Sequence, residues 1–408
     1  MLAPAYIREN TDEVRTAIAR RGMSVDLDRW LKLDARRAEL IPLVDTARSK
    51  LKLDGKPTEE QLIQLQKEKQ DLARHEEELK YIEAEWQRLL EDIPNLIAEG
   101  TPEGGEDASV EIRTGGTKPV FGFSPKDHLA LNDELNFIDF ELGAKVAGSR
   151  FYYLRDKGVR LWDAVQALAK AELRQRGFEL LYVPHMVNSR VATGTGFLPR
   201  GEERQIYQAE GEDLNMIATA ELPLTGFAMD EVVDVTTPLL LSASSPCYRL
   251  EAGAYGKFSK GLYRVHQFEK LEMYIYCQPN ESERLLEEIL AIEEALCERL
   301  EIPYHVIRIA DGDLSAPAYK KYDLEYWSPV DESYRELTSC SNCTDYQARR
   351  LNIRYRSADG TLVHPHTLNG TAVTSSRTLI ALLENHQTED GRVRLPSALV
   401  SYYGEEYL

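Results

Sequence analysis

The sequence is poor in several features that would assign it to common classes of protein. It has five cysteines in 408 residues, a small and odd number that gives no disulfide framework and is typical of a reducing compartment. No apolar run reaches the roughly 18 residues that a membrane span needs. The start, Met-Leu-Ala-Pro-Ala-Tyr and then charged residues, has neither the apolar core of a signal peptide nor the character of a transit peptide. We therefore expect a cytoplasmic protein with no membrane contact.

The chain also lacks an excess of positive charge and the loops of common nucleotide-binding folds. Its formal net charge is −19, which argues against non-specific coating of nucleic acid but leaves room for a local basic surface that binds RNA. The sequence shows no internal repeat, no P-loop and no G-x-G-x-x-G after a β-prone run. Nothing resembles a Ser-His-Asp triad. The length leaves room for two or three domains and a large core.

The first hundred residues have the spacing of a long helix. From Thr58 to Ile93, apolar residues recur every three or four positions, as in a coiled-coil seam. The seam residues are Leu62, Leu65, Leu72, Leu79, Ile82, Trp86, Leu89 and Ile93, with polar Lys69 and Glu76 at two further positions. Residues 58–61 form a capping-box pattern, and Pro94 marks the end of a helix roughly 50 Å long.

A second helical segment, about residues 27–53, precedes this helix and carries apolar residues at similar spacing. These are Leu33, Leu40, Leu43, Val44, Ala47 and Leu51. Pro42 within the segment predicts a kink or an interruption. A turn at 54–57 would join the two helices into an antiparallel hairpin, whose tip carries Arg48, Lys50, Lys52 and Lys56. Such a hairpin serves as an oligomerisation or scaffold element, or as a lever that reaches a distant polyanion.

The rest of the chain has a different organisation. A linker rich in Gly, Glu and Pro at 100–107 predicts a boundary between a helical domain, residues 1–107, and a second domain, residues 108–408. Beyond the linker, short β-prone runs alternate with helices such as 162–176 and 281–300. This order predicts an α+β fold with a mostly antiparallel sheet.

Two β-prone runs joined by a loop at 253–261 predict a hairpin with its chemistry on one face. Arg249 and Glu251 are two residues apart and share one face of a strand, as do Arg264, His266 and Phe268 on the returning strand. A fixed guanidinium suits a phosphate and a ring suits a purine, so the hairpin fits an ATP-binding sheet. The alternative is a charged hairpin with a surface ion pair.

Two short segments carry side chains that suit other parts of such a site. In Thr219-Ala220-Glu221 the hydroxyl and the carboxylate could hold an ammonium group, although a helix cap explains the same residues. The segment 336–342, Glu-Leu-Thr-Ser-Cys-Ser-Asn, places a carboxylate and hydroxyls at the end of a β run. Such oxygen ligands suit Mg²⁺ that bridges phosphates, and a Ser-rich turn is the alternative.

A third segment predicts an arginine at the start of a helix. Residues 367–371 lead into Ser375-Ser376-Arg377 and then a helix-like run to Asn385, so that Arg377 could face a phosphate or lie over a base. An ordinary capped helix with a surface arginine is the alternative. Cys340 and Cys343, with His364 and His366, also have half the spacing of a zinc site, but buried thiols explain them better.

Together these segments resemble the seryl-tRNA synthetases of the bacterial type, which are class II aminoacyl-tRNA synthetases. The resemblance covers essentially the whole chain, with its motifs in the family's order and spacing. The matching segments are 7–10 and 93–96 around the arm, 149–152, the loop 194–199, motif 1 at 177–184, motif 2 at 249–272 and motif 3 at 370–385.

The resemblance implies a role for each candidate residue. Arg249, Glu251 and Arg377 would be catalytic. Arg249 would bind the ATP α-phosphate, and Phe268 and Arg377 would hold the adenine, with Arg377 also close to the terminal phosphates. The implied ATP-binding set is Arg249, Leu250, Glu251, Val265, Phe268, Glu336, Leu337, Thr338, Ser339 and Arg377. Within it, Glu336 and Ser339 would ligate Mg²⁺. The implied serine-binding set is Thr219, Ala220 and Glu221 for the amino group, and Glu272 and Thr371 for the hydroxyl.

The implied activity is ATP-dependent ligation of serine to the 3′ end of tRNA(Ser) by a homodimer. Three segments differ from the family's usual pattern: Lys257-Phe258-Ser259-Lys260 in place of Arg-Asp-Thr-Arg, a bulkier approach to motif 3 at 372–376, and a first arm helix about two turns shorter. The alternatives are a paralogue that activates serine for another acceptor or resists a seryl-adenylate analogue, and a non-enzymatic RNA-binding relative. The retained arm favours tRNA, and the retained arginines disfavour the last alternative.

Overall fold

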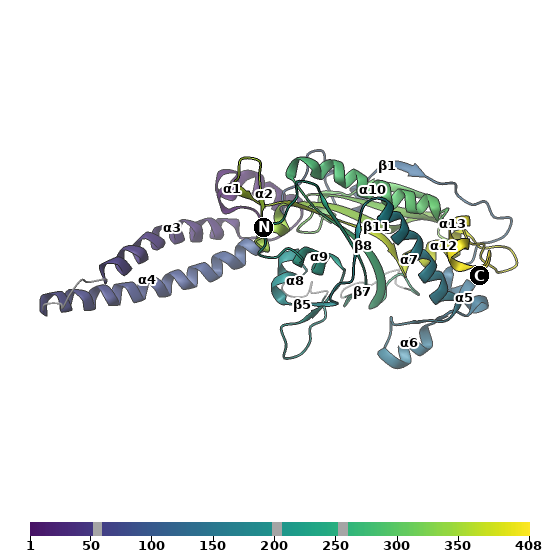
Figure 1. Cartoon of the computed structure of the whole chain (residues 1–408), viewed down its shortest axis with the longest axis horizontal. Helices are drawn as coiled ribbons and strands as arrows, with labels where there is room; N and C mark the ends of the chain where they lie inside the picture. The colour runs from purple at the N-terminus through teal and green to yellow at the C-terminus, as the bar shows by residue number, and fades with distance from the viewer. Residues whose placement is uncertain (52–58, 198–205, 252–259) are drawn as a thin grey trace. The chain divides into compact units, whose positions relative to one another are not determined.

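The computed structural model describes residues 1–51, 59–197, 206–251 and 260–408 (Figure 1). The chain divides into two compact units, Met1–Leu96 and Ile97–Leu408. Several predicted features lie outside the described residues: Lys52, Lys56, the turn at 54–57, the cap at Thr58, Leu198-Pro199 and Lys257-Phe258-Ser259. Within the described part of the chain, no helix has the length and apolar character to cross a membrane.

The first unit is helical and contains the predicted hairpin. Its helices are α1 (Pro4–Glu9), α2 (Thr11–Arg20), α3 (Leu27–Lys50) and α4 (Glu59–Asp92), and α3 and α4 lie side by side (Figure 1). Asp26 caps α3, because its carboxylate accepts a hydrogen bond from the backbone N–H of Arg29. The prediction of a helical hairpin is confirmed.

The seam of the hairpin follows the three-four spacing. Leu72, Ile82 and Leu89 of α4 are buried, and so are Leu40 and Val44 of α3. Of the two outcomes predicted at Pro42, a kink or an interruption, the interruption is wrong, because α3 continues through the proline. Burial of apolar side chains two residues before and two residues after the proline offsets the one hydrogen bond that it cannot donate. Leu43 of the predicted seam is instead 45% exposed.

Arginines of α3 pair with glutamates of α4 along the sides of the hairpin. The ion pairs are Arg29–Glu85 (2.9 Å), Arg36–Glu78 (2.8 Å), Arg37–Glu83 (3.2 Å) and Arg48–Glu76 (2.8 Å). Glu76, one of the two polar residues at seam positions, is therefore paired with an arginine, while Lys69 is exposed. Near the tip, Lys50 is exposed, whereas Arg48 is already engaged across the hairpin.

The second unit is built on one eight-stranded sheet. In spatial order its strands are β1 (Val110–Gly115), β9 (Tyr304–Arg308), β10 (Lys320–Ser328), β11 (Ser333–Thr344), β14 (His366–Thr374), β8 (Gln267–Cys277), β7 (Leu239–Tyr248) and β4 (Glu179–Leu181). Every neighbouring pair is antiparallel except β4 and β7, which are parallel. The prediction of an α+β fold with a mostly antiparallel sheet is confirmed.

The two faces of the sheet carry different layers, as the alternation along β8 shows. Leu271, Met273 and Ile275 join the main core with α7 (Lys157–Gln175), α10 (Ser282–Arg299), α12 (Arg377–Asn385) and α13 (Ser397–Tyr403). Tyr274 and Tyr276 join a second core with α9 (Glu221–Gly226) and α11 (Tyr346–Arg350). The long helices α7 and α10 lie across the first face (Figure 1). The opposite face of the sheet packs against α9 and α11 and carries the site described below.

The remaining elements are short and connect these layers. They are η1 (Glu106–Ala108), α5 (His128–Leu135), β2 (Ile138–Asp139), α6 (Phe140–Ala147), β3 (Tyr153–Leu154), β5 (Met186–Val187), α8 (Ser189–Thr195), β6 (Asn215–Met216), η2 (Pro279–Glu281), η3 (Asp311–Asp313), β12 (Tyr355–Arg356) and β13 (Leu362–Val363).

Candidate active site

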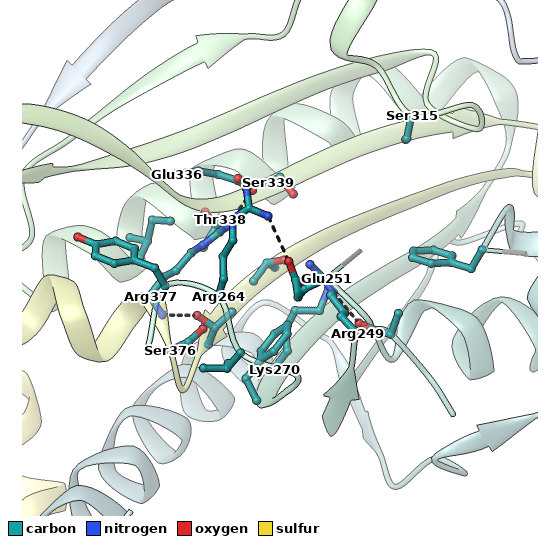
Figure 2. Close-up of a pocket in the computed structure, with 18 of the residues that line it drawn as sticks. Arg249, Glu251, Arg264, Lys270, Ser315, Glu336, Thr338, Ser339, Ser376 and Arg377 are labelled. Carbon is teal, nitrogen blue, oxygen red and sulfur yellow. Dashed lines mark hydrogen bonds and ion pairs between the residues drawn. The ribbon is translucent and has the colours of Figure 1, made fainter. Parts of the chain in front are cut away.

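A cavity of about 550 Å³ opens on the sheet where motif 2, β11 and the start of α12 meet (Figure 2). Its walls are strongly charged, with five basic and two acidic side chains. The lining residues are Gly196, Phe197, Ala218, Arg249, Glu251, Tyr263, Arg264, Val265, Phe268, Lys270, Ser315, Lys321, Glu336, Leu337, Thr338, Ser339, Thr371, Thr374, Ser376 and Arg377. A cavity with an excess of guanidinium and ammonium groups suits a polyanion such as a nucleotide triphosphate.

Two β-bulges decide which side chains reach the cavity. Glu336 and Ser339 are three residues apart on β11, so regular alternation would place them on opposite faces. The β10–β11 register advances by one residue on β10 and by two on β11 between the pairs Leu324–Thr338 and Glu325–Glu336. Because this bulge inserts an extra residue, both Glu336 and Ser339 face the cavity.

The neighbouring strand β14 uses the same device. Its register against β8 skips Ala372 between the pairs Thr371–Glu272 and Val373–Leu271. Thr371 and Thr374, also three residues apart, therefore both line the cavity. The segment 336–342 lies inside a strand that continues to Thr344, not at its end, so both the predicted strand end and the alternative of a Ser-rich turn are wrong.

The predicted hairpin exists, but its chemical residues lie beyond the strand ends. β7 ends at Tyr248 and β8 begins at Gln267. Arg249 continues the pairing for one more residue: its N–H donates to the carbonyl of His266 (3.0 Å), and its own carbonyl lies 2.9 Å from Nδ1 of His266. At Glu251 the backbone turns to a φ of +48°, which ends the extended conformation. Both Arg249 and Glu251 still face the cavity.

The returning segment shares its face only in part. Arg264 and Phe268 line the cavity, as predicted. His266, which we expected beside them, packs instead against the rings of Phe151 (5.3 Å between centroids) and Tyr207 (6.4 Å). It supports the wall from behind, because both its backbone carbonyl and its ring Nδ1 contact the backbone of Arg249.

The guanidinium of Arg249 is held above an aromatic ring. Its centre lies 5.1 Å from the centroid of the Phe268 ring, and its Nε donates to the carbonyl of Ala218 at 3.3 Å. Arg264, in turn, donates to the carboxylate of Glu251 at 3.1 Å (Figure 2). Arg249 over a ring and Arg264 on a carboxylate thus lie on the two segments that continue β7 and precede β8 in motif 2.

A second charged group lies where β10, β11 and α12 meet. Arg377, the first residue of α12 as predicted, lies 3.0 Å from the carboxylate of Glu336. Lys321 on β10 pairs with Asp323 at 2.9 Å. Burial raises the pKa of Glu336, but the charges of Arg377 and Lys321 outweigh burial and hold the pKa well below its usual range. Glu336 is therefore an ionised carboxylate at neutral pH.

The donor set at this point fits a divalent cation bound together with phosphates. Glu336 supplies an ionised carboxylate and Ser339 a hydroxyl on the same wall, and both are hard oxygen ligands. Two protein ligands suit Mg²⁺, which completes its shell with water and phosphate oxygens. Among the described residues, no cluster of three or more His, Cys, Asp or Glu is placed to hold a metal by itself.

Of the residues expected to hold an amino acid, Thr371 lines the cavity, and the other four are buried next to wall residues. Thr219 and Glu221 are buried close in sequence to the wall residue Ala218, and Glu221 is the first residue of α9. Burial and the charge of Glu272 raise the pKa of Glu221 to about 7. Glu272 forms a buried ion pair with Lys270, and its register partner on β14 is Thr371.

Five predicted site residues do not line the cavity itself. Thr219, Ala220, Glu221 and Glu272 are buried next to wall residues, and Leu250 lies half-buried between Arg249 and Glu251. The hydroxyl of Thr219 accepts a hydrogen bond from the N–H of Glu221 at 3.1 Å, so the cap-like contact of the alternative interpretation is present as well.

Sequence reasoning missed two basic residues of the wall. Lys270 lies two residues before Glu272 on β8, so strand alternation would have placed it on the same face. Lys321 carries no such local signal, because its place depends on the pairing of β10 with β11.

The zinc interpretation is wrong in its geometry. Cys340 belongs to the main core, whereas Sγ of Cys343 accepts from Nδ2 of Asn369 at 3.7 Å on the side of Glu221. His364 and His366 have other contacts, with the carbonyl of Ile353 (2.7 Å) and the hydroxyl of Ser282 (2.8 Å). Two thiols on opposite faces of a sheet cannot bind one metal.

Comparisons with known proteins identify the family of the chain. Residues 1–97 match the model of the seryl-tRNA synthetase N-terminal domain, and residues 204–386 match that of the class II tRNA synthetase core domain (G, H, P, S and T). The chain is 47% identical to a serine–tRNA ligase of Rubrobacter xylanophilus, covering 100% of this chain and 99% of the relative. It is 43% identical to that of Treponema denticola, with 99% of each chain covered.

Solved structures give the same result. The crystal structure of seryl-tRNA synthetase from Pyrococcus horikoshii complexed with ATP matches with a TM-score of 0.92 and 37% identity, covering 100% of this chain and 99% of that one. A prolyl-tRNA synthetase of Giardia lamblia, at 16% identity and a TM-score of 0.59, shares the fold. The full-length matches at both domains show that this chain belongs to the seryl-tRNA synthetase family of class II aminoacyl-tRNA synthetases.

Proposed function

We propose that the chain activates L-serine with ATP and transfers it to the 3′ end of tRNA(Ser). In the first step an oxygen of the serine carboxylate attacks the α-phosphorus of ATP, and pyrophosphate leaves. In the second, a ribose hydroxyl of the tRNA attacks the activated carbonyl, and AMP leaves. The observation that carries the proposal is the juxtaposition of a basic nucleotide-sized cavity with the buried carboxylates Glu221 and Glu272.

Neither step needs a side-chain nucleophile, because the substrate supplies it. The protein positions two reactants and stabilises the charge that builds on the phosphate. Arg249, whose guanidinium contacts the Ala218 carbonyl and the Phe268 ring, would bind the α-phosphate. Arg377 and Phe268 would hold the adenine, with Arg377 also close to the terminal phosphates. Val265, Leu337 and Thr338 would complete the ATP-binding wall, with Leu250 beside it.

The role of Mg²⁺ would be to neutralise phosphate charge and orient the leaving pyrophosphate. Glu336 and Ser339 are the residues of this chain that would hold it. In the protein without substrate, the guanidinium of Arg377 forms an ion pair with the carboxylate of Glu336, so that the two charges neutralise each other. ATP bound with Mg²⁺ offers each of them a new partner of opposite charge.

Recognition of serine would divide between its amino group and its hydroxyl. Thr219 and Glu221, with Ala220 between them, would receive the ammonium group. Glu272 and Thr371 face each other across the β14–β8 ladder and would bind the hydroxyl. A site built to hydrogen-bond a hydroxyl rejects the analogue without it by about 10⁴–10⁵, because its buried polar groups would stay unpaired.

We further propose that the chain acts as a homodimer through the exposed edge at β4, in the segment that resembles motif 1. β4 ends the sheet among the strands that the structure describes, and this segment carries Leu180 (39% exposed) and Tyr182 (89% exposed). An apolar edge strand in contact with water is a liability unless another surface covers it. A second copy of this chain, meeting the same edge, would bury both side chains.

The helical hairpin would bind the tRNA, and the catalytic domain would follow the linker at 100–107. This assignment distinguishes tRNA ligation from serine activation for another acceptor. An acceptor that is not RNA would have no use for a long charged hairpin. The cytoplasm, where tRNA is charged, is the expected place of action.

Serine-dependent exchange of pyrophosphate into ATP, followed by charging of purified tRNA, tests the proposal. We expect both activities, with threonine and alanine as controls for specificity. Exchange without charging of any tRNA would favour the paralogue that serves another acceptor. Absence of serine-dependent exchange would overturn the enzymatic assignment as a whole.

A further inference from the structure

A buried glutamine lies behind the site proposed for the amino group. Gln347 belongs to α11, is fully buried, and has its Nε2 2.7 Å from Oε1 of Glu221. The ATP-binding and serine-binding sets do not include this residue. Its side-chain amide nevertheless supplies a fixed donor to the carboxylate of Glu221.

The orientation of the Gln347 amide is determined by its other partners. Nε2 also lies 3.3 Å from the carbonyl of Thr195, and a backbone carbonyl can only accept a hydrogen bond. Oε1 accepts from the hydroxyls of Tyr274 (3.0 Å) and Thr367 (2.8 Å). All four hydrogen-bonding positions of the amide are filled, so a reversed amide would set its oxygen against the Thr195 carbonyl.

The donors to Glu221 converge on one of its two oxygens. Asn369 donates from Nδ2 to the same Oε1, at 3.0 Å, and also reaches Sγ of Cys343. In the part of the chain that the structure describes, the second oxygen, Oε2, accepts no hydrogen bond. The carboxylate is thus anchored through Oε1, and Oε2 remains able to accept a hydrogen bond from a ligand.

The charge state of Glu221 is balanced between opposing influences. Burial and the like charge of Glu272 on β8 favour the neutral form, while the hydrogen bond from Gln347 and the charges of Lys270 and Arg249 favour the ionised form. The outcome is a pKa of about 7, at which the loss of one donor changes the population of the ionised form at physiological pH. Tyr274, whose hydroxyl donates to Gln347, stays neutral, because burial raises its pKa well above its ordinary value.

We propose that Gln347 is a positioning residue that keeps Glu221 ionised at neutral pH and directs its Oε2 to the ammonium group of the amino acid. The inference rests on the proposed function, in which Glu221 receives that ammonium. It adds that the pH range over which the enzyme binds serine is set from α11, by a residue that does not touch the substrate. An ammonium group binds a carboxylate strongly only when the carboxylate carries its charge.

The test is the pH dependence of the KM for serine in pyrophosphate exchange by the full-length chain, between pH 5.5 and 8.5. In the wild type, we expect KM to rise as pH falls below about 7. In Gln347→Met, which keeps the size and removes the donor, the midpoint should move up by about one pH unit, so that KM at pH 7 rises about fivefold. The KM for ATP and kcat at pH 8.5 should change less than about twofold, since neither depends on the ammonium contact.

Three further variants make the result decisive. Gln347→Glu, nearly isosteric, must share one proton with Glu221 and should shift the midpoint in the same direction. Glu221→Gln should raise KM and remove the pH dependence. Thr367→Val takes away a partner of the Gln347 oxygen but leaves the donor, and should keep the wild-type midpoint.

An unchanged midpoint in both Gln347 variants would overturn the inference, as would an equal shift in Thr367→Val or an equal rise of KM at every pH. If the Glu221→Gln variant exchanges pyrophosphate at the wild-type rate and with an unaltered KM for serine, Glu221 is not the ammonium ligand. Absence of serine-dependent exchange in the wild type would overturn the proposed function itself, and this inference with it.

Discussion

The carboxylate of Glu336 lies 3.0 Å from the guanidinium of Arg377, one carried by β11 and the other by the first residue of α12. Both side chains line the cavity, so the pair holds opposite charges ready at the point where phosphates and their cation would bind. This ion pair keeps Glu336 and Arg377 in place before substrate binds, in a cavity that carries five basic side chains.

Replacing Arg377 by Gln should weaken ATP binding and slow pyrophosphate exchange. Loss of a charge-assisted contact with a phosphate costs about 1.5–3 kcal/mol, or roughly tenfold to a hundredfold in kcat/KM for ATP. The measurement is exchange at varied ATP and saturating serine. Arg392→Gln, whose guanidinium pairs with Asp390 on the surface, is the matched control and should leave kcat/KM unchanged. Equal values for the two variants would contradict the assignment of Arg377.

Replacing Glu272 by Ala should lower the rate of serine-dependent exchange by about a hundredfold or more, because the hydroxyl of serine loses its acceptor. ATP binding, followed by protection of the protein against thermal unfolding, should persist. The buried Lys270 loses its partner in this variant, so its unfolding temperature must be measured in parallel. A folded variant with an unchanged exchange rate would show that the hydroxyl contact has been misassigned.

Replacing Leu180 and Tyr182 together by Glu should convert the proposed dimer into monomers. The two introduced carboxylates would have to be buried without an opposite charge if two copies met at the edge of β4. Light scattering coupled to size exclusion measures the change in mass. Val120→Glu, at a side chain that is 98% exposed, is the control and should not alter it. Dimers that survive the double substitution would place the interface elsewhere.

Replacing Gly370 by Ala should destabilise the second unit by about 1–3 kcal/mol, because the core behind β14 has no room for a methyl group. A Cβ at this position would lie 2.3 Å from Cγ2 of Ile289 and 3.2 Å from Cβ of Cys340. Urea denaturation gives the free energy of unfolding. Gly105→Ala meets no heavy atom within 4 Å and should be neutral. Similar stabilities for the two variants would contradict the close packing of α10 on β14.

Replacing His305 by Gln should destabilise the protein more at pH 6 than at pH 9. Nδ1 of His305 lies 2.7 Å from Glu111 on β1, Nε2 lies 2.6 Å from Glu325 on β10, and the ring stacks on Tyr334 of β11. Burial lowers the pKa of His305, but the two carboxylates outweigh burial and raise it.

A raised folded-state pKa fixes the direction of this effect. The stabilisation is complete below the unfolded-state pKa, about 6.5, and is lost as pH rises through the higher folded-state pKa. The free energy of unfolding of wild type and variant should therefore differ by about 1–3 kcal/mol at pH 6 and by less at pH 9. An equal difference at both pH values would mean that the imidazolium does not form.

The helical hairpin was predictable from sequence because its signal is local. Residues such as Leu72, Ile82 and Leu89 repeat with the period of the helix, and the same period buries them. The antiparallel sheet followed from short β-prone runs punctuated by turn residues, and Arg377 at a helix start from the small residues before it.

The site was predictable in its residue types but not in the geometry that gathers them. Strand alternation puts Glu336 and Ser339 on opposite faces, and only the bulge at Leu337 reverses this. A bulge depends on the partner strand, so no pattern within β11 announces it. Arg249 and Glu251 reach the cavity as expected, although from a turn with a positive φ at Glu251, not from a regular strand.

Asp34 of α3 has a consequence for the shape of the hairpin. This buried carboxylate accepts from Arg8 of α1 and from the indole N–H of Trp86 of α4, each at 2.8 Å. Sliding α4 along α3 by one heptad would take away Trp86 and leave a buried charge short of a donor, at a cost of about 1–3 kcal/mol or more. A leucine seam tolerates such a slip, because one leucine replaces another. Asp34 therefore fixes the register of α4 against α3, and a fixed register gives the hairpin a single length.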